Sequence, residues 1–308
     1  MRNAFSKTLT KLANKNKNLI LLTGDLGYTV FEDFLKTHPK RFVNMGVAEA
    51  NMMGVACGLS LQGFVPVVYS IATFATMRGF EQIRTDICVH NANVKIVGTG
   101  GGLSYGHAGS THHALEDIAI MRSLPNMTVI CPSDPLQTEM ATEQMIIHKG
   151  PVYLRLGKRG EPVIYKKPAK FKIGKGIVLR EGKKAAIIAS GNLVHNALLT
   201  SKILEGYGIN LTVIDMHTVK PLDKKLILQL VKSHELICTL EEHSIIGGLG
   251  SAVAEVIAEN PIKKNLYFHR FGIPDIFIER AGSQEFLRKK YNLTPKKISG
   301  KIIKLINT

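Results

Sequence analysis

"FVNMGVAEANMMGVACGLSLQGFVPVV", residues 42–68, places one carboxylate, Glu49, inside an otherwise apolar and small-residue stretch. Glycine or alanine recurs every four residues from Gly46 to Gly58, so a helix that starts near Gly46 would present one smooth face to a neighbouring backbone. Glu49 would then lie in the first turn, where the positive end of the helix dipole favours an acidic side chain. A structural role and a chemical role for this carboxylate are both open at this point.

The length and composition indicate a globular protein with two domains of ordinary size. The chain has 308 residues, 45% of them hydrophobic, which is enough to bury large cores. No uninterrupted apolar run approaches the roughly 18 residues of a membrane-spanning helix, and residues 1–22 lack the apolar core of a signal peptide. We therefore expect a cytoplasmic protein without membrane contact.

The cysteines are scattered without the spacing of a metal site or a redox pair. They are Cys57, Cys88, Cys131 and Cys238. This distribution suits buried, reduced thiols and predicts no disulfide framework.

The formal net charge of +16 at pH 7 raises the question of a polyanionic partner. Clustered Lys and Arg side chains are the electrostatic footprint of phosphate binding. Here many of the lysines fall in residues 11–18, 165–176 and 293–304, without a recognisable nucleic-acid-binding module. We expect these lysines to be solvated and the protein to bind no nucleic acid.

Short apolar runs that end in turn residues recur along the chain, with helical patterns between them. In the first half they cover residues 18–25, 63–70, 93–102, 126–134 and 150–157. In the second half they cover residues 183–192, 208–221, 234–243 and 265–275. Strands separated by helices imply right-handed crossovers and mostly parallel sheets. The fold class is therefore α/β, with two domains that each contain a mostly parallel sheet flanked by helices.

A segment rich in Lys, Pro and Gly separates the two series of strands. We expect a first domain over residues 1–160, a linker over 161–180 with one or two edge strands, and a second domain over 181–308. In open parallel sheets, ligands bind outside the carboxyl ends of the strands. The chemistry should therefore collect in the segments that follow the strands, among them residues 70–80 and 99–113.

Five motifs of this chain resemble one enzyme family. They are "NMGVAEANMMGVACGLSLQG" (44–63), "YSIATFATMRGFEQIRTD" (69–86), "GSTHHALEDIAIMRSLPNMTVICPSDP" (109–135), "GPVYLRLGKRG" (150–160) and "TLEEHSIIGGLGSAVAEV" (239–256). Together they are similar to the pyrimidine-binding and C-terminal domains of transketolase-type thiamine diphosphate enzymes, in that family's order and spacing. The resemblance covers nearly the whole chain and implies thiamine diphosphate as the cofactor.

The resemblance gives Glu49 a chemical role. The family's glutamate in the pattern GxAE hydrogen-bonds a ring nitrogen of the cofactor's aminopyrimidine and so helps to activate the thiazolium carbon. A carboxylate beside Val47, Ala48 and Met52 would be desolvated and could share a proton with a weakly basic ring. The resemblance therefore implies that Glu49 is both catalytic and cofactor-binding.

Three further side chains match positions at which the family contacts its cofactor. Phe74 matches the aromatic residue that stacks on the aminopyrimidine, Phe80 lies further along the same helix, and Met77 takes a position that is often aromatic. An aromatic ring offers a flat partner, and methionine can pack on a ring through its sulfur. For Phe80 an ordinary core role is equally open.

The resemblance also implies a set of substrate contacts. His112 aligns with the histidine of the family's "DGPTH", which faces the substrate channel, and a neutral imidazole there could move protons on substrate hydroxyls. His107 stands where a carboxylate is usual, and Ala108 replaces an acid that meets a sugar hydroxyl. Lys158, beside Arg159, aligns with the arginine that grips the acceptor phosphate, and it offers a point charge in place of a bidentate fork.

Part of the cofactor site is expected on another chain. Full-length relatives hold the diphosphate and its divalent metal in an N-terminal domain, through a "GDG" motif and a later asparagine, whereas "TGDLG" (23–27) stands here in another context. We expect a split enzyme in which a separate N-terminal-type subunit holds the diphosphate and Mg²⁺. This chain would hold no metal and would form a self-dimer within an α2β2 heterotetramer.

The resulting hypothesis is the C-terminal subunit of a transketolase-like transferase. It would move a two-carbon ketol unit from a ketose donor to an aldose or modified-sugar acceptor. The alternatives are a beta subunit of a 2-oxo acid dehydrogenase or a decarboxylating thiamine diphosphate synthase, and a non-catalytic scaffold subunit of the same fold. The retention of Glu49 and Phe74 together argues against the scaffold.

Overall fold

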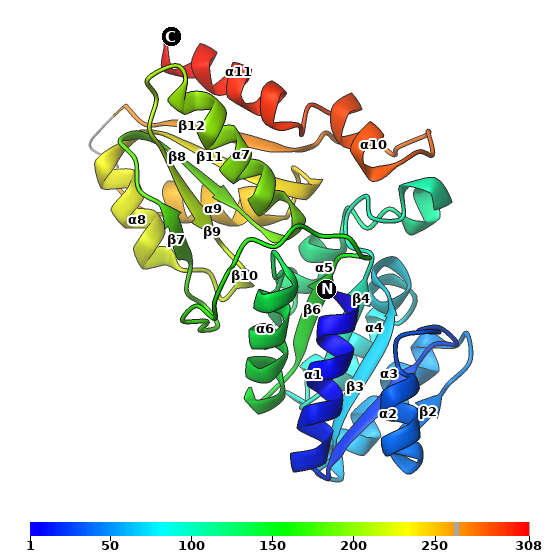
Figure 1. The fold of residues 1–308 in the computed structure, drawn as a ribbon. Helices are drawn as coiled ribbons and strands as arrows, with labels where there is room; N and C mark the ends of the chain where they lie inside the picture. Colours follow the sequence, from blue (N-terminus) through cyan, green and yellow to red (C-terminus); the bar gives the residue numbers. More distant parts are fainter. Residues whose placement is uncertain (262–264, 308) are drawn as a thin grey trace.

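The computed structural model describes residues 1–261 and 265–307, which form two α/β domains (Figure 1). The elements of the first domain are α1 (Arg2–Lys15), β1 (Leu19–Thr23), α2 (Glu32–Thr37), β2 (Phe42–Asn44), α3 (Glu49–Leu61), β3 (Val65–Ile71), α4 (Phe80–Gln82), β4 (Lys95–Thr99), α5 (Asp117–Ser123), β5 (Thr128–Ile130), α6 (Pro135–Ile147) and β6 (Val152–Leu156). The remaining elements are β7 (Ile177–Arg180), β8 (Lys184–Ala189), α7 (Val194–Glu205), β9 (Leu211–Asp215), β10 (Thr218–Lys220), α8 (Lys224–Ser233), β11 (His234–Ser244), α9 (Leu249–Ala258), β12 (Tyr267–Ile273), α10 (Gln284–Lys290) and α11 (Pro295–Ile306).

Two mostly parallel sheets confirm the predicted fold class. The first sheet has seven strands in the order β10-β5-β6-β4-β3-β1-β2, and the second has five in the order β12-β11-β8-β9-β7. Only β10 and β7 pair antiparallel to their neighbours among the described strands. β7 lies within the segment expected as the linker and forms one edge of the second sheet.

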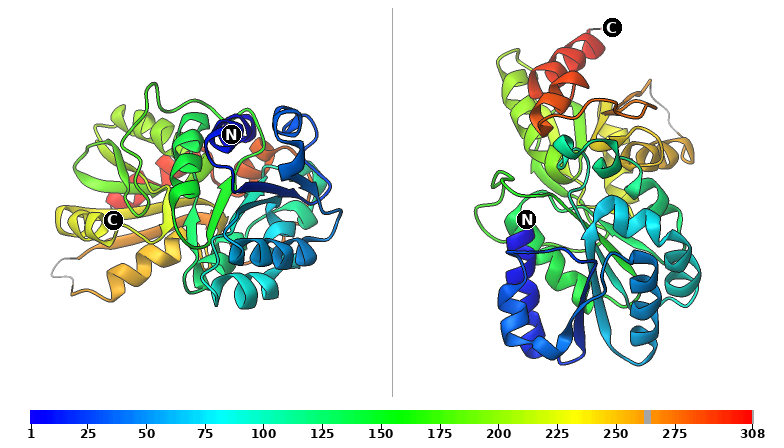
Figure 2. Two further views of the ribbon diagram at one scale, coloured as in Figure 1. Left: turned by 90° about the horizontal axis from the view of Figure 1, so that it is seen from below. Right: turned by 90° about the vertical axis from the view of Figure 1, so that its right-hand side faces the viewer.

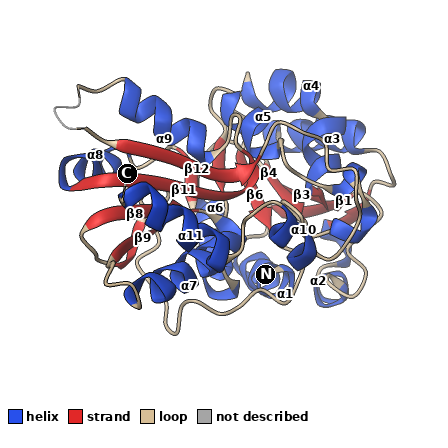
Figure 3. Cartoon of the chain, turned by 90° about the horizontal axis from the view of Figure 1, so that it is seen from above, coloured by secondary structure: helices blue, strands red, loops and turns tan. Residues whose placement is uncertain are grey.

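Helices cover both faces of each sheet (Figures 2 and 3). In the first domain, alternate strand residues point to opposite faces, so Val68 and Ile96 pack in the core beneath α3, whereas Val67 and Val97 pack in the core beneath α1 and α6. The strands are therefore buried on both sides. This explains why they read in the sequence as continuous apolar runs instead of alternating patterns.

The second half of the chain lends a strand to the first sheet. β10 pairs with β5 and forms the edge of the seven-stranded sheet, although it follows β9 of the second sheet after two residues. The sequence pattern predicted one strand over residues 208–221, and the structure divides this run between the two sheets. The domains are thus joined by a shared sheet as well as by the linker.

Helix α3 begins at Glu49, three residues later than the small-residue period predicts. Gly46 adopts φ +71°, a left-handed conformation that cannot continue into an α-helix, and it forms the turn that precedes the helix. The expected close backbone approach occurs at one point only. A Cβ atom on Gly79 would lie 3.5 Å from Ala50 Cα, whereas Gly58 has open space around it.

The four cysteine side chains are buried, as expected, and the structure pairs none of them in a disulfide. Among the described residues, no helix combines the length and the apolar character that crossing a membrane requires.

A buried carboxylate joins the linker to both halves of the chain. Asp215, at the end of β9, accepts hydrogen bonds from the Tyr165 hydroxyl at 2.7 Å and from Ser133 Oγ and Gln137 Nε2 at 2.8 Å each. Burial raises the pKa of Asp215 to about 6, although these three donors act in the opposite direction. The linker is therefore fastened to the first residues of α6 and to the second sheet.

A buried ion pair fixes the junction between the domains. The Arg155 guanidinium of β6 donates from Nε to Asp117 Oδ2 at 2.7 Å and from Nη2 to Asp117 Oδ1 at 3.1 Å. Its Nη2 also donates to the backbone oxygens of Ala114 and Glu242, the latter in β11 of the second domain. The Tyr153 hydroxyl donates to Asp117 at 2.6 Å. The pair thus holds three segments together.

We expect Arg155→Met to lower the free energy of unfolding by about 3–5 kcal/mol, because Asp117 would keep a buried charge without its cation. Equilibrium denaturation in urea measures this loss. Lys224→Met is the control, since its exposed partner Glu259 stays hydrated, and we expect a change within about 0.5 kcal/mol. Equal losses of unfolding free energy in the two variants would contradict the stabilising role of the buried Asp117–Arg155 pair.

Candidate active site

Glu49 lies buried at the carboxyl ends of two adjacent parallel strands. Glu49 is the first residue of α3 and is 2% exposed. Oε1 accepts a hydrogen bond from Ser70 Oγ of β3 at 2.9 Å, and a Cβ atom on Gly24, just after β1, would lie 3.3 Å from the same oxygen. The fold therefore presents one carboxylate at the strand ends, where the sequence predicts the chemistry.

The surroundings of Glu49 are less apolar than the sequence suggests. Met52 is buried beside it, but Val47 is 70% exposed. Oε2 accepts a hydrogen bond from Arg78 Nη1 at 2.9 Å, and the Arg78 side chain is 44% exposed. The carboxylate is thus paired with a cation that can reach solvent, instead of standing alone in an apolar pocket.

Arg78 is the main residue that sequence reasoning missed. Its guanidinium carbon lies 3.9 Å from the centroid of the Phe74 ring, so one planar cation contacts both Phe74 and Glu49. The segment Phe74–Arg78 is a π-helical turn directly after β3. A spacing of four residues in a helical segment could have placed Arg78 on the side of Phe74.

His112, in the loop after β4, forms a cluster with Glu49, Arg78 and Phe74. Its ring centroid lies 5.0 Å from that of Phe74 in an edge-on arrangement and 6.0 Å from that of Tyr105. Thr111 Oγ1 lies 2.9 Å from its Nδ1. Burial, then His113 and Arg78, lower the pKa of His112, which favours a neutral imidazole.

The remaining predicted residues differ in how closely they approach this cluster. Lys158 Nζ lies 4.7 Å above the Tyr105 ring, which links it to His112 through one aromatic side chain. Met77 is 41% exposed and lines a cavity of about 330 Å³ together with Thr111. Their proposed contacts stay predictions.

Three predicted residues lie apart from the cluster or turn to solvent. Phe80 is half-buried and packs against the core of the first domain. His107 is exposed in the short 3-10 helix Gly106–Ala108, and Arg159 is exposed in the loop after β6. The cofactor role of Phe80 and the substrate roles of His107 and Arg159 stay predictions.

Tyr105 explains an unusual glycine at the end of β4. Gly100 has φ +78°, and a Cβ atom there would lie 2.0 Å from the Tyr105 ring. The glycine at this position thus makes room for Tyr105. This tyrosine is a second site residue that the sequence did not reveal.

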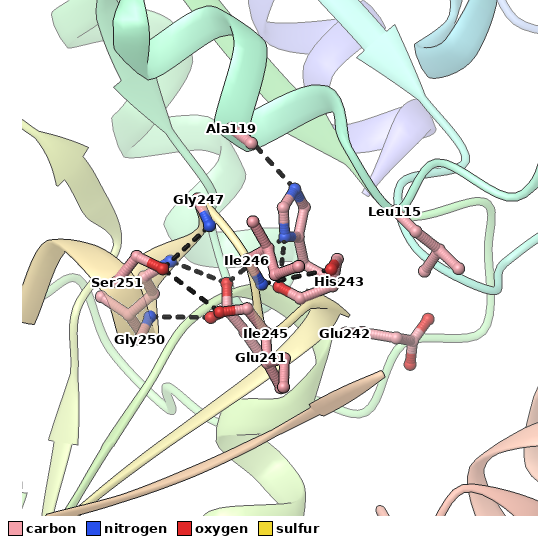
Figure 4. A network of polar contacts seen from close by, with 12 residues as sticks. Leu115, Ala119, Glu241, Glu242, His243, Ile245, Ile246, Gly247, Gly250 and Ser251 are labelled. Carbon is pink, nitrogen blue, oxygen red and sulfur yellow. Dashed lines mark hydrogen bonds and ion pairs between the residues drawn. The ribbon is translucent and has the colours of Figure 1, made fainter. Parts of the chain in front are cut away.

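The backbone N–H groups of the glycine-rich motif after β11 are bound by the Glu241 carboxylate (Figure 4). Glu241 accepts hydrogen bonds from the backbone N–H groups of Leu249 and Gly250 at 2.7 Å each, so it occupies the N-terminus of α9. His243 donates from Nδ1 to the Ser244 oxygen at 2.7 Å and accepts from the Ala119 N–H at 3.3 Å. The motif therefore has a structural role, and the structure gives no reason to place a phosphate there.

A carboxylate at the strand ends, an aromatic ring that shares the Arg78 guanidinium with it and a histidine against that ring form one cluster in the first domain. The chain belongs to the transketolase family, since residues 1–161 match the transketolase pyrimidine binding domain and residues 174–298 match the transketolase C-terminal domain.

Relatives of similar length support this assignment. The chain is 43% identical over 306 residues to a transketolase C-terminal section of Methanocaldococcus jannaschii, covering 98% of this chain and 95% of the relative. It is 38% identical to a 6-deoxy-6-sulfo-D-fructose transketolase subunit of Clostridium sp. (strain MSTE9), covering 97% and 92%. Among solved structures, a split-gene transketolase in an inactive beta4 tetramer gives a TM-score of 0.90 at 41% identity, covering 98% and 97%.

These similarities confirm the hypothesis of a transketolase-like transferase subunit that depends on thiamine diphosphate and works with a partner subunit. A longer enzyme also matches. The 1-deoxy-D-xylulose-5-phosphate synthase of Pelotomaculum thermopropionicum is 35% identical to this chain, which covers 46% of that enzyme.

We expect His112 to titrate below 6.5, its ordinary pKa, so that the imidazole stays neutral as the pH falls toward that value. Arg78→Ala removes one of the causes of this shift and should raise the pKa. Arg159→Ala, which removes an exposed cation that does not contribute to the shift, is the control. NMR titration of histidine-labelled protein, with the His112 signal assigned by His112→Gln, measures the His112 pKa in both variants. An unchanged pKa in Arg78→Ala would show that Arg78 does not contribute to the shift.

Proposed function

We propose that this chain supplies the aminopyrimidine half of a split thiamine diphosphate site and that a separate N-terminal-type subunit supplies the diphosphate ligands and Mg²⁺. The observation that carries the proposal is the buried Glu49 carboxylate at the strand ends, with Phe74 beside it. The assembly would be an α2β2 heterotetramer built on a self-dimer of this chain. The naming of similar-length relatives as transketolase subunits supports this arrangement.

The contacts of Arg78 indicate that the residues present fit the cofactor ring. Its guanidinium is planar, carries N–H donors, pairs with Glu49 and lies over Phe74. An aminopyrimidine is also planar and carries an amino group, so the same carboxylate and the same ring face can receive it. Because Arg78 is half exposed, it can withdraw into solvent and leave both surfaces to the ring.

Each predicted residue then has a defined task. Glu49 shares a proton between its Oε2 atom and a ring nitrogen, while the Ser70 hydroxyl holds Oε1 in place. Phe74 and Met77 provide the apolar side of the cofactor pocket, whereas Phe80 packs against the core of the first domain. When bound, thiamine diphosphate supplies the electron sink for breaking and forming the carbon–carbon bond of the ketol unit.

The substrate side is assigned to the histidine loop and to the residues after β6. His112, held neutral, moves a proton on a substrate hydroxyl, and His107 contacts the sugar at the rim. Lys158 and Arg159 attract the phosphate or another anionic group of the acceptor. Tyr105 lies between His112 and Lys158 and fills space beside the acceptor.

The chain alone is expected to bind thiamine diphosphate weakly or not at all, because the charged end of the cofactor would find its ligands on the partner. Calorimetry with Mg²⁺ present tests this for the isolated chain and for its complex with the N-terminal-type subunit. Tight, Mg²⁺-dependent binding by the isolated chain would refute the split site.

Glu49→Gln should preserve the fold and slow turnover in the complex by about 10²-fold or more, because an amide cannot exchange the proton. Glu81→Gln, an exposed acid on the adjoining helical segment, is the matched control and should act like the wild type. Activity of the Glu49 variant within about threefold of the wild type would support the scaffold reading instead.

The acceptor is expected to be a specialised carbonyl compound. Ala108 lacks a polar partner for a sugar hydroxyl, and Tyr105 takes the space that Gly100 leaves. The Clostridium relative, which is named for a sulfo-sugar, supports a modified sugar. A site with fewer hydroxyl partners should discriminate less among ordinary pentose phosphates.

We therefore expect the complex to use ribose 5-phosphate as acceptor with a kcat/KM below the roughly 10⁴–10⁸ M⁻¹s⁻¹ of an enzyme on its own substrate. Steady-state kinetics with xylulose 5-phosphate as donor measures this value. Consumption of pyruvate, supplied as donor in place of xylulose 5-phosphate, would favour the decarboxylating synthase. A kcat/KM for ribose 5-phosphate within the stated range would contradict the specialised acceptor.

A further inference from the structure

Strand β12 and helix α11 enclose a cavity of about 500 Å³ in the second domain. The cationic or titratable side chains that line it are His269, Arg270, Lys296, Lys297, Lys301 and Lys304. Its volume falls in the range of small-molecule sites. Four lysines of the segment 293–304, which the sequence predicts to be solvated, thus line one concave surface.

A second cavity adjoins the first and is also lined by cationic side chains. It measures about 560 Å³, shares Asn292 and Lys297 with the first cavity, and is lined further by Arg280, Lys289 and Lys290. Within the described part of the chain, no carboxylate side chain lines either cavity. The two cavities thus form one cationic groove, which ordinary mixing of surface charges would not produce.

Three lysines of the groove have no ion-pair partner among the residues that the structure describes. Over residues 1–261 and 265–307, no ion pair joins Lys296, Lys297 or Lys301 to a carboxylate. Lys297 and Lys301 are four residues apart on the helix, a spacing at which like charges repel. Their repulsion would be relieved by an anion bound between them.

Gly300 opens the floor of the first cavity. It lies in the middle of α11, where glycine is less favourable than alanine, and a Cβ atom built on it would meet no atom within 4 Å. The space above the helix backbone is therefore available to a ligand. Burial, then Lys301 and Arg270, lower the pKa of His269 in the cavity wall, as expected in a positive field.

Phe271 and Leu293, which are buried, and the half-buried Tyr291 give the first cavity an apolar part of its lining. A ligand that fills it would combine an organic body with several negative charges. Inorganic phosphate alone would leave this apolar part uncovered.

We propose that the groove between β12 and α11 binds a small organic ligand that carries two or more phosphate groups, of the nucleoside di- or triphosphate class. The phosphates would contact Lys296, Lys297 and Lys301, and the organic body would lie against Tyr291. The groove lies on α11, at the end of the molecule away from α1 and α3 (Figures 1 and 2). This inference does not depend on the proposed function of the first domain.

Calorimetry with ATP on the purified full chain tests the proposal, with tripolyphosphate and AMP as comparison ligands. We expect saturable binding of one ATP per chain that weakens with added salt, tripolyphosphate binding more weakly than ATP, and AMP weaker than ATP by about tenfold or more. Lys297→Glu with Lys301→Glu should reduce ATP affinity by about tenfold or more. Lys7→Glu with Lys11→Glu, an exposed pair with the same spacing on α1, is the matched control and should change affinity by no more than about twofold.

A second variant tests the groove without changing its charge. Gly300→Leu raises the helix propensity of α11, so it should keep the fold while its side chain fills the cavity floor and weakens ATP binding. The proposal is overturned if ATP does not saturate the chain at about 1 mM. It is also overturned if the two double variants lose ATP affinity equally, or if Lys158→Met abolishes ATP binding while the α11 variants keep it. Tighter binding of duplex DNA than of ATP to the groove would overturn it as well.

Discussion

The buried pair of Asp117 and Arg155 is the interaction on which the position of the histidine loop after β4 depends. Arg155 donates to the backbone at Ala114, just after the histidines, and a Cβ atom on Gly101 would lie 2.7 Å from its Nε. The loop over residues 99–113 is therefore held at both of its ends by one guanidinium. Because that group also donates to the Glu242 backbone, the loop and the second domain share the same anchor.

Arg78 shows how a neighbouring, partly exposed cation can keep the Glu49 carboxylate buried. A glutamate that is 2% exposed without a partner would carry the full cost of losing its hydration, and the ion pair offsets part of that cost. The same guanidinium covers the Phe74 ring and reaches solvent on its other side. The fold thus keeps the site assembled, with a group in place that can leave without unfolding any element.

The sequence predicted the architecture well because its signal is local. Alternating apolar runs and helical patterns indicated both sheets, and Glu49 does begin its helix. The start of α3 was placed too early, since a small-residue period does not reveal that Gly46 is left-handed. β10 escaped detection because its three residues merge with β9 in one apolar pattern. Arg78, Tyr105 and the lysines of α11 depend on contacts between distant segments, which the order of residues does not display.

The pairing of β10 with β5 makes the two domains interdependent during folding. The first sheet acquires its last strand only after residues 218–220 have left the ribosome, well beyond the linker. Until then β5 is an edge strand with unpaired backbone groups, which is the kind of edge that recruits other chains. Residues 1–160 produced by themselves would keep this edge open, so the boundary that looks natural in the sequence does not divide the protein into two self-sufficient parts.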